Sequence, residues 1–142
     1  MRSSYRFVIL GEPRGKGRPR FTRDGHTYTD SETRAYEKKV RQAFLAAYPL
    51  REPFPKGEPV RAVMTAYYAI PKSESKIKRE LMATGYIRPT KKPDTDNIAK
   101  IVLDSLNGLA YHDDAQVVTC EVRKYYGIEP RVEVEVKEVM NE

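Results

Sequence analysis

The stretch RVEVEVKEV, residues 131–139, alternates apolar and charged side chains at every second position. Val132, Val134 and Val136 fall on one face of an extended chain, whereas the charged side chains between them fall on the other face. This alternation indicates a strand in a sheet that has one face packed on a core and the other toward water. The stretch therefore predicts a buried face around which the rest of the domain assembles.

The run before this strand, AQVVTCEVRKYYG at 115–127, is rich in β-branched and aromatic residues and predicts a second strand. Only a short turn around Gly127 and Pro130 separates the two runs, so we expect the two strands to be adjacent. Cys120 lies in an apolar-alternating part of this run and is expected to be buried. It is the only cysteine, so an intrachain disulfide is excluded.

Five further elements are predicted upstream, where helix caps, glycines and prolines mark their limits. The order is then β-α-β-α-α-β-β, which indicates a single α/β (α+β) domain over residues 1–142 with a mixed sheet packed against helices. The predicted elements are strands at 5–10 and 60–70, a helix capped by Asp30 or Ser31 that ends before Pro49, a short charged helix at 73–84, and a helix that begins at Asp94 or Asp96 and ends before Gly108.

The composition is that of a folded protein, and its charge favours a polyanionic partner, although many basic proteins bind no nucleic acid. Of the 142 residues, 39% are hydrophobic and 32% charged, which argues against disorder. The net charge of +6 favours nucleic acid as the partner. The first apolar run is too short for a signal peptide, and no segment approaches the roughly 20 apolar residues of a membrane span. We therefore expect a cytoplasmic protein without a membrane partner.

Five aspartates crowd into the segment from Asp94 to Asp114. Asp94 or Asp96 can cap the following helix, but a cap needs only one of them. Asp104 interrupts the apolar run IVLDSL and shares a helix face with Asn97 and Lys100, at i, i+3 and i+7 spacing. Two interpretations remain open from the spacing: a carboxylate site for a hard cation such as Mg²⁺, or helix caps on a solvated surface. The full set of acids is Asp94, Asp96, Asp104, Asp113 and Asp114.

Two other site types do not fit. An EF-hand loop from Asp94 would need Gly at position 99, where Ala99 stands. The segment GEPRGKG lacks the spacing of a nucleotide-binding P-loop and has Gly17 where that loop needs Ser or Thr, so no nucleotide cofactor is expected. His112 precedes Asp113, and its participation in a site stays open.

The Gly-, Pro- and Arg-rich segment 11–23 is predicted to be an exposed basic arm or loop. Basic side chains on a flexible, Gly-rich track suit contacts with a phosphate backbone, although a plain solvated loop has the same composition. Its basic residues are Arg14, Lys16, Arg18, Arg20 and Arg23.

The stretch KPDTDNIAKIVLDSLNGLAYHDDAQVV, residues 92–118, resembles the RusA family of Holliday junction resolvases. The shared pattern is Asp-x-Asp-Asn, a Lys four residues later, an Asp four further on, and an Asp-Asp that leads into Gln-Val. The opening from Gly11 to Arg20 is also similar to the start of many RusA-like members. The matching residues of the acidic block are Asp94, Asp96, Asn97, Lys100, Asp104, Asp113, Asp114, Gln116 and Val117.

The resemblance implies a homodimeric, Mg²⁺-dependent endonuclease that acts on four-way or other branched DNA, with one or two Mg²⁺ ions per subunit. A non-catalytic branched-DNA-binding protein and a nuclease for other branched DNA are the alternatives. By the resemblance, the catalytic residues are Asp94, Asp96, Asp114 and Lys100. The expected metal ligands are Asp94, Asp96, Asp114 and Asp113, with Asn97 and Asp104 in supporting positions. From their charge, the expected DNA contacts are Arg14, Lys16, Arg18, Arg20, Lys91 and Lys92.

Overall fold

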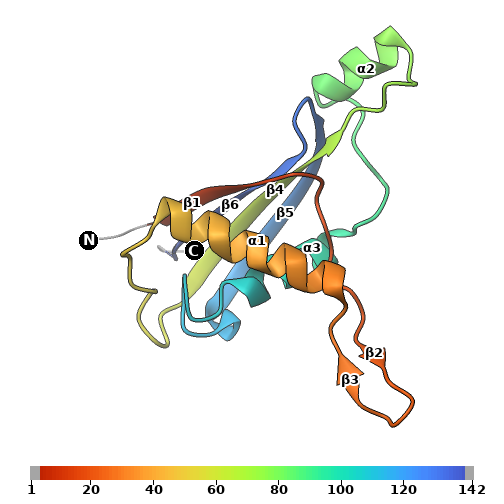
Figure 1. Cartoon of the computed structure of the whole chain (residues 1–142). Helices are drawn as coiled ribbons and strands as arrows, with labels where there is room; N and C mark the ends of the chain where they lie inside the picture. The colour runs from red at the N-terminus through yellow and green to blue at the C-terminus, as the bar shows by residue number, and fades with distance from the viewer. Residues whose placement is uncertain (1–3, 140–142) are drawn as a thin grey trace.

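The computed structural model describes residues 4–139 as one four-stranded mixed sheet with helices α1 and α3 on one face (Figure 1). The strands of this sheet lie in the order β1-β6-β4-β5. The predicted single α+β domain is confirmed. The elements are β1 Ser4–Leu10, β2 Arg20–Phe21, β3 Thr27–Tyr28, α1 Ser31–Ala47, β4 Val60–Ala69, α2 Lys76–Ala83, α3 Thr95–Ser105, the 3₁₀ turn η1 Asp114–Gln116, β5 Val117–Gly127 and β6 Arg131–Glu138.

The core lies between one face of the sheet and the two helices. The valines of β6 are buried there as predicted, and β1 pairs antiparallel with β6 from Ser4 opposite Lys137 to Leu10 opposite Arg131. Tyr36, Val40 and Phe44 give α1 an apolar stripe at helical spacing. The side chain of Asp30 accepts a hydrogen bond of 2.8 Å from the Thr33 backbone N–H, so the predicted cap of α1 is confirmed.

The predicted adjacency of the last two strands is wrong, because β4 lies between them. β4 pairs parallel with β5 and antiparallel with β6. Alternate residues of β4 from Val60 to Tyr68 are buried, and a strand buried on one face in this way is stabilised by neighbours on both edges. The chain between β5 and β6 therefore passes the end of β4. Gly127 permits this because a Cβ there would lie 3.1 Å from the Tyr67 ring.

Cys120 is exposed, so the prediction of a buried cysteine is also wrong. β5 is an edge strand, and α3 packs on one of its faces. Val118 and Cys120 alternate with the half-buried residues of this strand, and the side chain of Val118 is also exposed.

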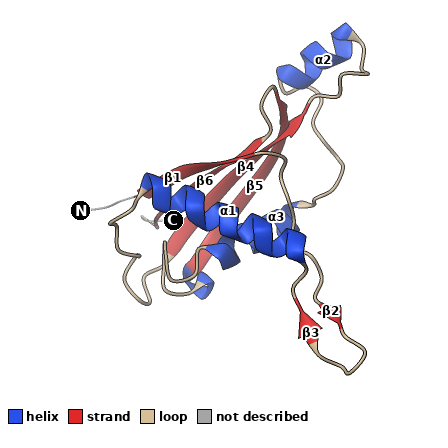
Figure 2. Cartoon of the chain, in the orientation of Figure 1, coloured by secondary structure: helices blue, strands red, loops and turns tan. Residues whose placement is uncertain are grey.

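Two projections extend from the body, one built on the β2–β3 hairpin and one on α2 (Figure 2). The hairpin begins inside the predicted loop 11–23. Its strands β2 and β3 have only two residues each, too few to produce a recognisable pattern in the sequence. The helix predicted at 73–84 begins later, at Lys76, because Ser75 rather than Ser73 caps it. Within residues 4–139, no helix has the length and apolar character needed to cross a bilayer.

Candidate active site

The first part of the basic segment, residues 11–17, is packed against both helices. A Cβ on Gly15 would lie 2.9 Å from the Asn97 Cβ, and the Lys16 backbone N–H donates a 3.1 Å hydrogen bond to the Asn97 carbonyl. The Gly17 N–H donates to the Thr33 hydroxyl at 3.1 Å. The expected loop is therefore packed on the body as far as Gly17, although Arg14 is exposed, and the residues beyond Gly17 lead into the hairpin.

Asp94 occupies the N-cap position of α3, yet its side chain makes no capping hydrogen bond. Instead its Oδ1 accepts a 2.7 Å hydrogen bond from the Asn97 side-chain amide. This bond, then the backbone N–H of Asp94, and then the charges of Lys92 and Lys124 lower the pKa of the carboxyl. Because Asp94 is exposed, it presents an ionised carboxylate to solvent at the end of the helix.

Two residues close to Asp94, Lys124 and Tyr68, were not identified by the sequence analysis. The Tyr68 hydroxyl donates a 2.7 Å hydrogen bond to the Pro93 carbonyl, next to Asp94. The Lys124 ammonium donates to the Lys91 carbonyl and lies 5.1 Å from the centre of the Tyr68 ring. These residues come from β4 and β5, so no local signal in the sequence connects them with the acidic block.

Asp104 and Asp114 form a second carboxylate position beyond the last turn of α3. A hydrogen bond with Asp104 first, then burial, and then Asp113 raise the pKa of Asp114 to about 6. The Asp114 backbone N–H donates to the Asn107 side chain at 2.7 Å, which holds this turn against the end of α3. Asp113 has a local role, because its carboxylate caps η1 by accepting from the Ala115 N–H.

Lys16 connects this second position to α1. Its Nζ forms an ion pair with Glu37 and lies 3.5 Å from the Asp104 Oδ2. Burial alone would lower the pKa of Lys16, but the hydrogen bond and charge of Glu37, together with Asp104, outweigh it and raise the pKa. The structure therefore places this predicted DNA contact against carboxylates of the protein. Glu37 was missed because only the packing of α1 on α3 brings it here.

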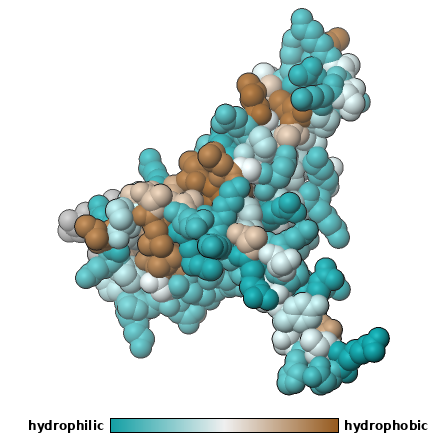
Figure 3. Space-filling view, viewed as in Figure 1, coloured by the Kyte–Doolittle hydropathy of each residue, from teal (hydrophilic) through white to brown (hydrophobic). Residues whose placement is uncertain are grey.

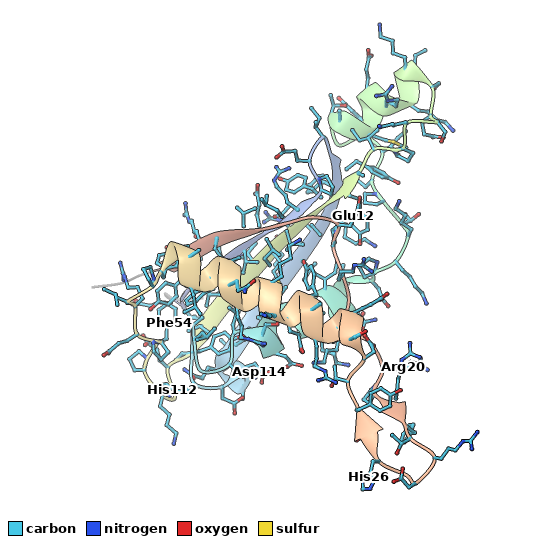
Figure 4. The ribbon with its side chains drawn as sticks, in the orientation of Figure 1. Glu12, Arg20, His26, Phe54, His112 and Asp114 are labelled. Carbon is cyan, nitrogen blue, oxygen red and sulfur yellow. The ribbon has the colours of Figure 1, made fainter. Side chains whose placement is uncertain are left out.

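A cleft of about 530 Å³ lies between residues 12–17 and the N-termini of α1 and α3. Arg14, Lys92, Asp94 and Asn97 line this cleft. Figure 4 shows Asp114 on the body and Arg20 on the hairpin projection. The other exposed predicted residues are Arg18, Arg20, Lys91, Asp96 and Lys100.

The acids thus occupy two positions along α3. Asp94 and Asp96 lie at its first turn, whereas Asp104 and Asp114 meet at its other end. Eight residues separate Asp96 from Asp104, which corresponds to about 12 Å along a helix axis. Across the part of the chain that the structure describes, no three or more His, Cys, Asp or Glu side chains are grouped to hold one metal ion. The ligand set of Asp94, Asp96 and Asp114 stays a prediction.

The loop, the acidic helix and the last strand also lie within one match to known proteins. The family model for endodeoxyribonuclease RusA matches residues 11–137, from the packed loop into β6. The chain belongs to the RusA family of endodeoxyribonucleases. The family resemblance of the acidic block is confirmed.

The chain is also similar to two other proteins. The chain is 31% identical over 90 residues to the crossover junction endodeoxyribonuclease rusA of Lactococcus phage r1t, which covers 63% of this chain and 62% of the phage protein. It is 42% identical over 137 residues to the protein YqaN of Bacillus subtilis strain 168, described as uncharacterized, with 94% and 96% of the two chains covered.

Proposed function

We propose that this RusA-family chain is a Mg²⁺-dependent endonuclease that resolves four-way DNA junctions by paired, symmetric nicks. The family assignment and the phage relative support nuclease action on branched DNA. The observation that carries the proposal is the placement of Asp94. Its carboxylate is ionised, exposed and released from helix capping, and it lines a cleft shared with Arg14 and Lys92.

The donor chemistry of the acids fits a hard divalent cation. The high pKa of Asp114 reflects carboxylates held close together, where a proton relieves the repulsion. A cation relieves the same repulsion, and carboxylate oxygens are the ligands that Mg²⁺ prefers. Because the two positions lie about 12 Å apart along α3, Asp94 and Asp96 would hold one ion, and Asp114, with Asp113 beside it, would hold a second. When bound, the metal lowers the pKa of a water molecule and stabilises charge on the scissile phosphate.

The basic side chains of the protein bind and orient the DNA in this proposal. Lys100 lies on α3 one turn after Asp96, where its ammonium can neutralise the reacting phosphate. Lys16 holds residues 11–17 against α1 and α3 through Glu37 and Asp104, and so positions Arg14 at the cleft. The remaining backbone contacts come from Arg18, Arg20, Lys91 and Lys92.

Paired nicking requires two sites related by symmetry. A twofold homodimer would present one cleft to each of two opposite strands of a four-way junction. We therefore expect a dimer in solution. A monomer at micromolar concentration in light scattering, with full junction cleavage, would contradict this part of the proposal.

The decisive test compares a labelled four-way junction with a linear duplex of the same sequence, in Mg²⁺ and in EDTA. Wild type should make paired, ligatable nicks in the junction in Mg²⁺ only. Asp94→Asn and Asp96→Asn should each slow nicking by about 10²–10³-fold, as expected for loss of a charged group at the reacting centre. Glu129→Gln, in the exposed β5–β6 connection, is the matched control and should nick normally.

Two results would contradict the proposal. Full Mg²⁺-dependent nicking by Asp96→Asn would remove this carboxylate from the mechanism. Junction binding by wild type without nicks in either buffer would make the chain a branched-DNA-binding protein.

A further inference from the structure

Most of the net positive charge of the chain resides in the projection that carries α2. Residues 71–92, the α2 arm, contain seven Lys and Arg against two Glu, a net charge of +5 in a chain whose total is +6. Figure 3 shows mainly hydrophilic residues over this projection. None of the proposed catalytic steps uses the α2 part of the arm.

Several of these cations lack a neutralising partner in the protein. Lys78 pairs with Glu74 at 3.8 Å. Within residues 4–139, no ion pair engages Lys72, Lys76 or Arg79, and all three are exposed. Like charges gathered on one short helix repel one another, so a polyanion that binds here relieves a repulsion that the free protein carries.

The arm is held on the sheet rather than loosely attached. The Arg88 Nε donates a 2.9 Å hydrogen bond to the Lys124 carbonyl, and its guanidinium lies 4.1 Å from the Tyr125 ring centre. Met82 is the buried anchor of α2. At its end the arm leads directly into Asp94, so the position of α2 is linked to the cleft through the same backbone that carries the carboxylate.

The length of the connection limits how far α2 lies from the cleft. Residues 84–93 run without helix between α2 and Asp94, and ten extended residues span at most about 35 Å. At about 3.4 Å per base pair, this corresponds to roughly ten base pairs of duplex. A DNA arm that leaves the cleft along this side would meet α2 within its first helical turn.

We propose that the α2 arm is a second DNA-binding element, in which Lys72, Lys76 and Arg79 contact the phosphate backbone of a duplex arm of the branched substrate. This inference rests on the proposed function and adds a contact away from the nicked strand. The arm also exposes Ile77, at 72%, and Tyr86, at 82%, which would suit a protein partner. The concentration of positive charge on the arm favours DNA over a protein as its partner.

The test measures the salt dependence of junction binding, by fluorescence anisotropy in Mg²⁺, in the full chain carrying Asp96→Asn to prevent cleavage. The variant is Lys76→Ala with Arg79→Ala on α2. The matched control is Lys38→Ala with Arg41→Ala on α1, which removes the same residue types at the same i, i+3 spacing from another exposed helical surface. Thermal melts check that each variant is folded.

Each lost phosphate contact should lower the slope of log K against log salt by about 0.9. The α2 variant should therefore lose about one to two units of slope, whereas the α1 control keeps the slope of the parent. The difference should persist on a junction whose arms have fifteen base pairs, because such arms extend beyond the greatest distance that the connection allows.

Equal slopes for the α2 variant and its parent would overturn the proposal, as would an equal loss in the α1 control. Absence of any junction binding by the parent would instead refute the proposed function, so the two failures are distinguishable.

Discussion

Replacing Asp104 with Asn should make the folded protein more stable at neutral pH and flatten the pH dependence of its stability. In the metal-free chain, Asp104 is the largest cause of the high pKa of Asp114. Because the folded state binds this proton more tightly than the unfolded state, the free energy of unfolding falls as pH rises from about 4 to above 6. The Asp104→Asn substitution removes the carboxylate that raises the pKa of Asp114.

The magnitude follows from the pKa of Asp114. The rise from 3.8 to about 6, at about 1.4 kcal/mol for each pH unit, sets an upper bound of roughly 3 kcal/mol. Asp114 is only partly buried, so solvent screening reduces this to about 1–2 kcal/mol. Asp104 also lies 3.5 Å from Lys16, and losing that partly exposed ion pair costs about 0.2–1 kcal/mol at every pH. The net gain at pH 8 is about 1 kcal/mol.

Urea denaturation in EDTA at pH 4.5 and pH 8 measures this effect. Wild type should lose about 1–2 kcal/mol more than Asp104→Asn between the two pH values. Glu129→Gln, which removes a distant carboxylate, should follow wild type. An equal change in wild type and Asp104→Asn would show that the two carboxylates do not share a proton, and would refute the reasoning.

Three further outcomes are expected. Gly17→Ala should destabilise the protein by about 1–3 kcal/mol through overpacking, because its Cβ would lie 2.3 Å from the Asp30 carboxylate; an unchanged melting temperature would contradict this close packing. Tyr68→Phe should cost about 1 kcal/mol through the lost hydrogen bond to Pro93, measured by urea denaturation. Mg²⁺ at 100 times its dissociation constant should stabilise the chain by about 2.7 kcal/mol. A melting temperature that does not change when Mg²⁺ is added would argue against a bound ion.

The elements that depend on local pattern could be predicted from the sequence. The alternation of Val132, Val134 and Val136 predicted β6, and Asp30 predicted the start of α1, because strand period and helix capping are set by near neighbours in the chain. The order of strands was not accessible in this way. The short link between β5 and β6 favoured adjacency, whereas the burial of β4 between them depends on residues some 60 positions away.

The candidate site was also predictable only where the signal is local in the sequence. Asp94 was identified, but its sequence position suited a cap and a site equally, and only the hydrogen bond from Asn97 shows where its carboxylate points. Lys16 was identified as a basic residue, but its pairing with Glu37 requires α1 to pack on α3. Lys124 gave no signal, because its proximity to Asp94 arises from the sheet.

The pairing of β1 with β6 also determines when the protein can fold during its synthesis. Ser4 lies opposite Lys137, so the earliest strand to leave the ribosome finds its sheet neighbour more than 130 residues later. Until then β1 has a buried face without its partner strand, and such exposed apolar surface invites association with other chains. Translation speed and chaperone access should therefore influence the yield of this protein. The earlier synthesis of the acidic helix α3 should matter less, because α3 cannot take the place of β6 beside β1.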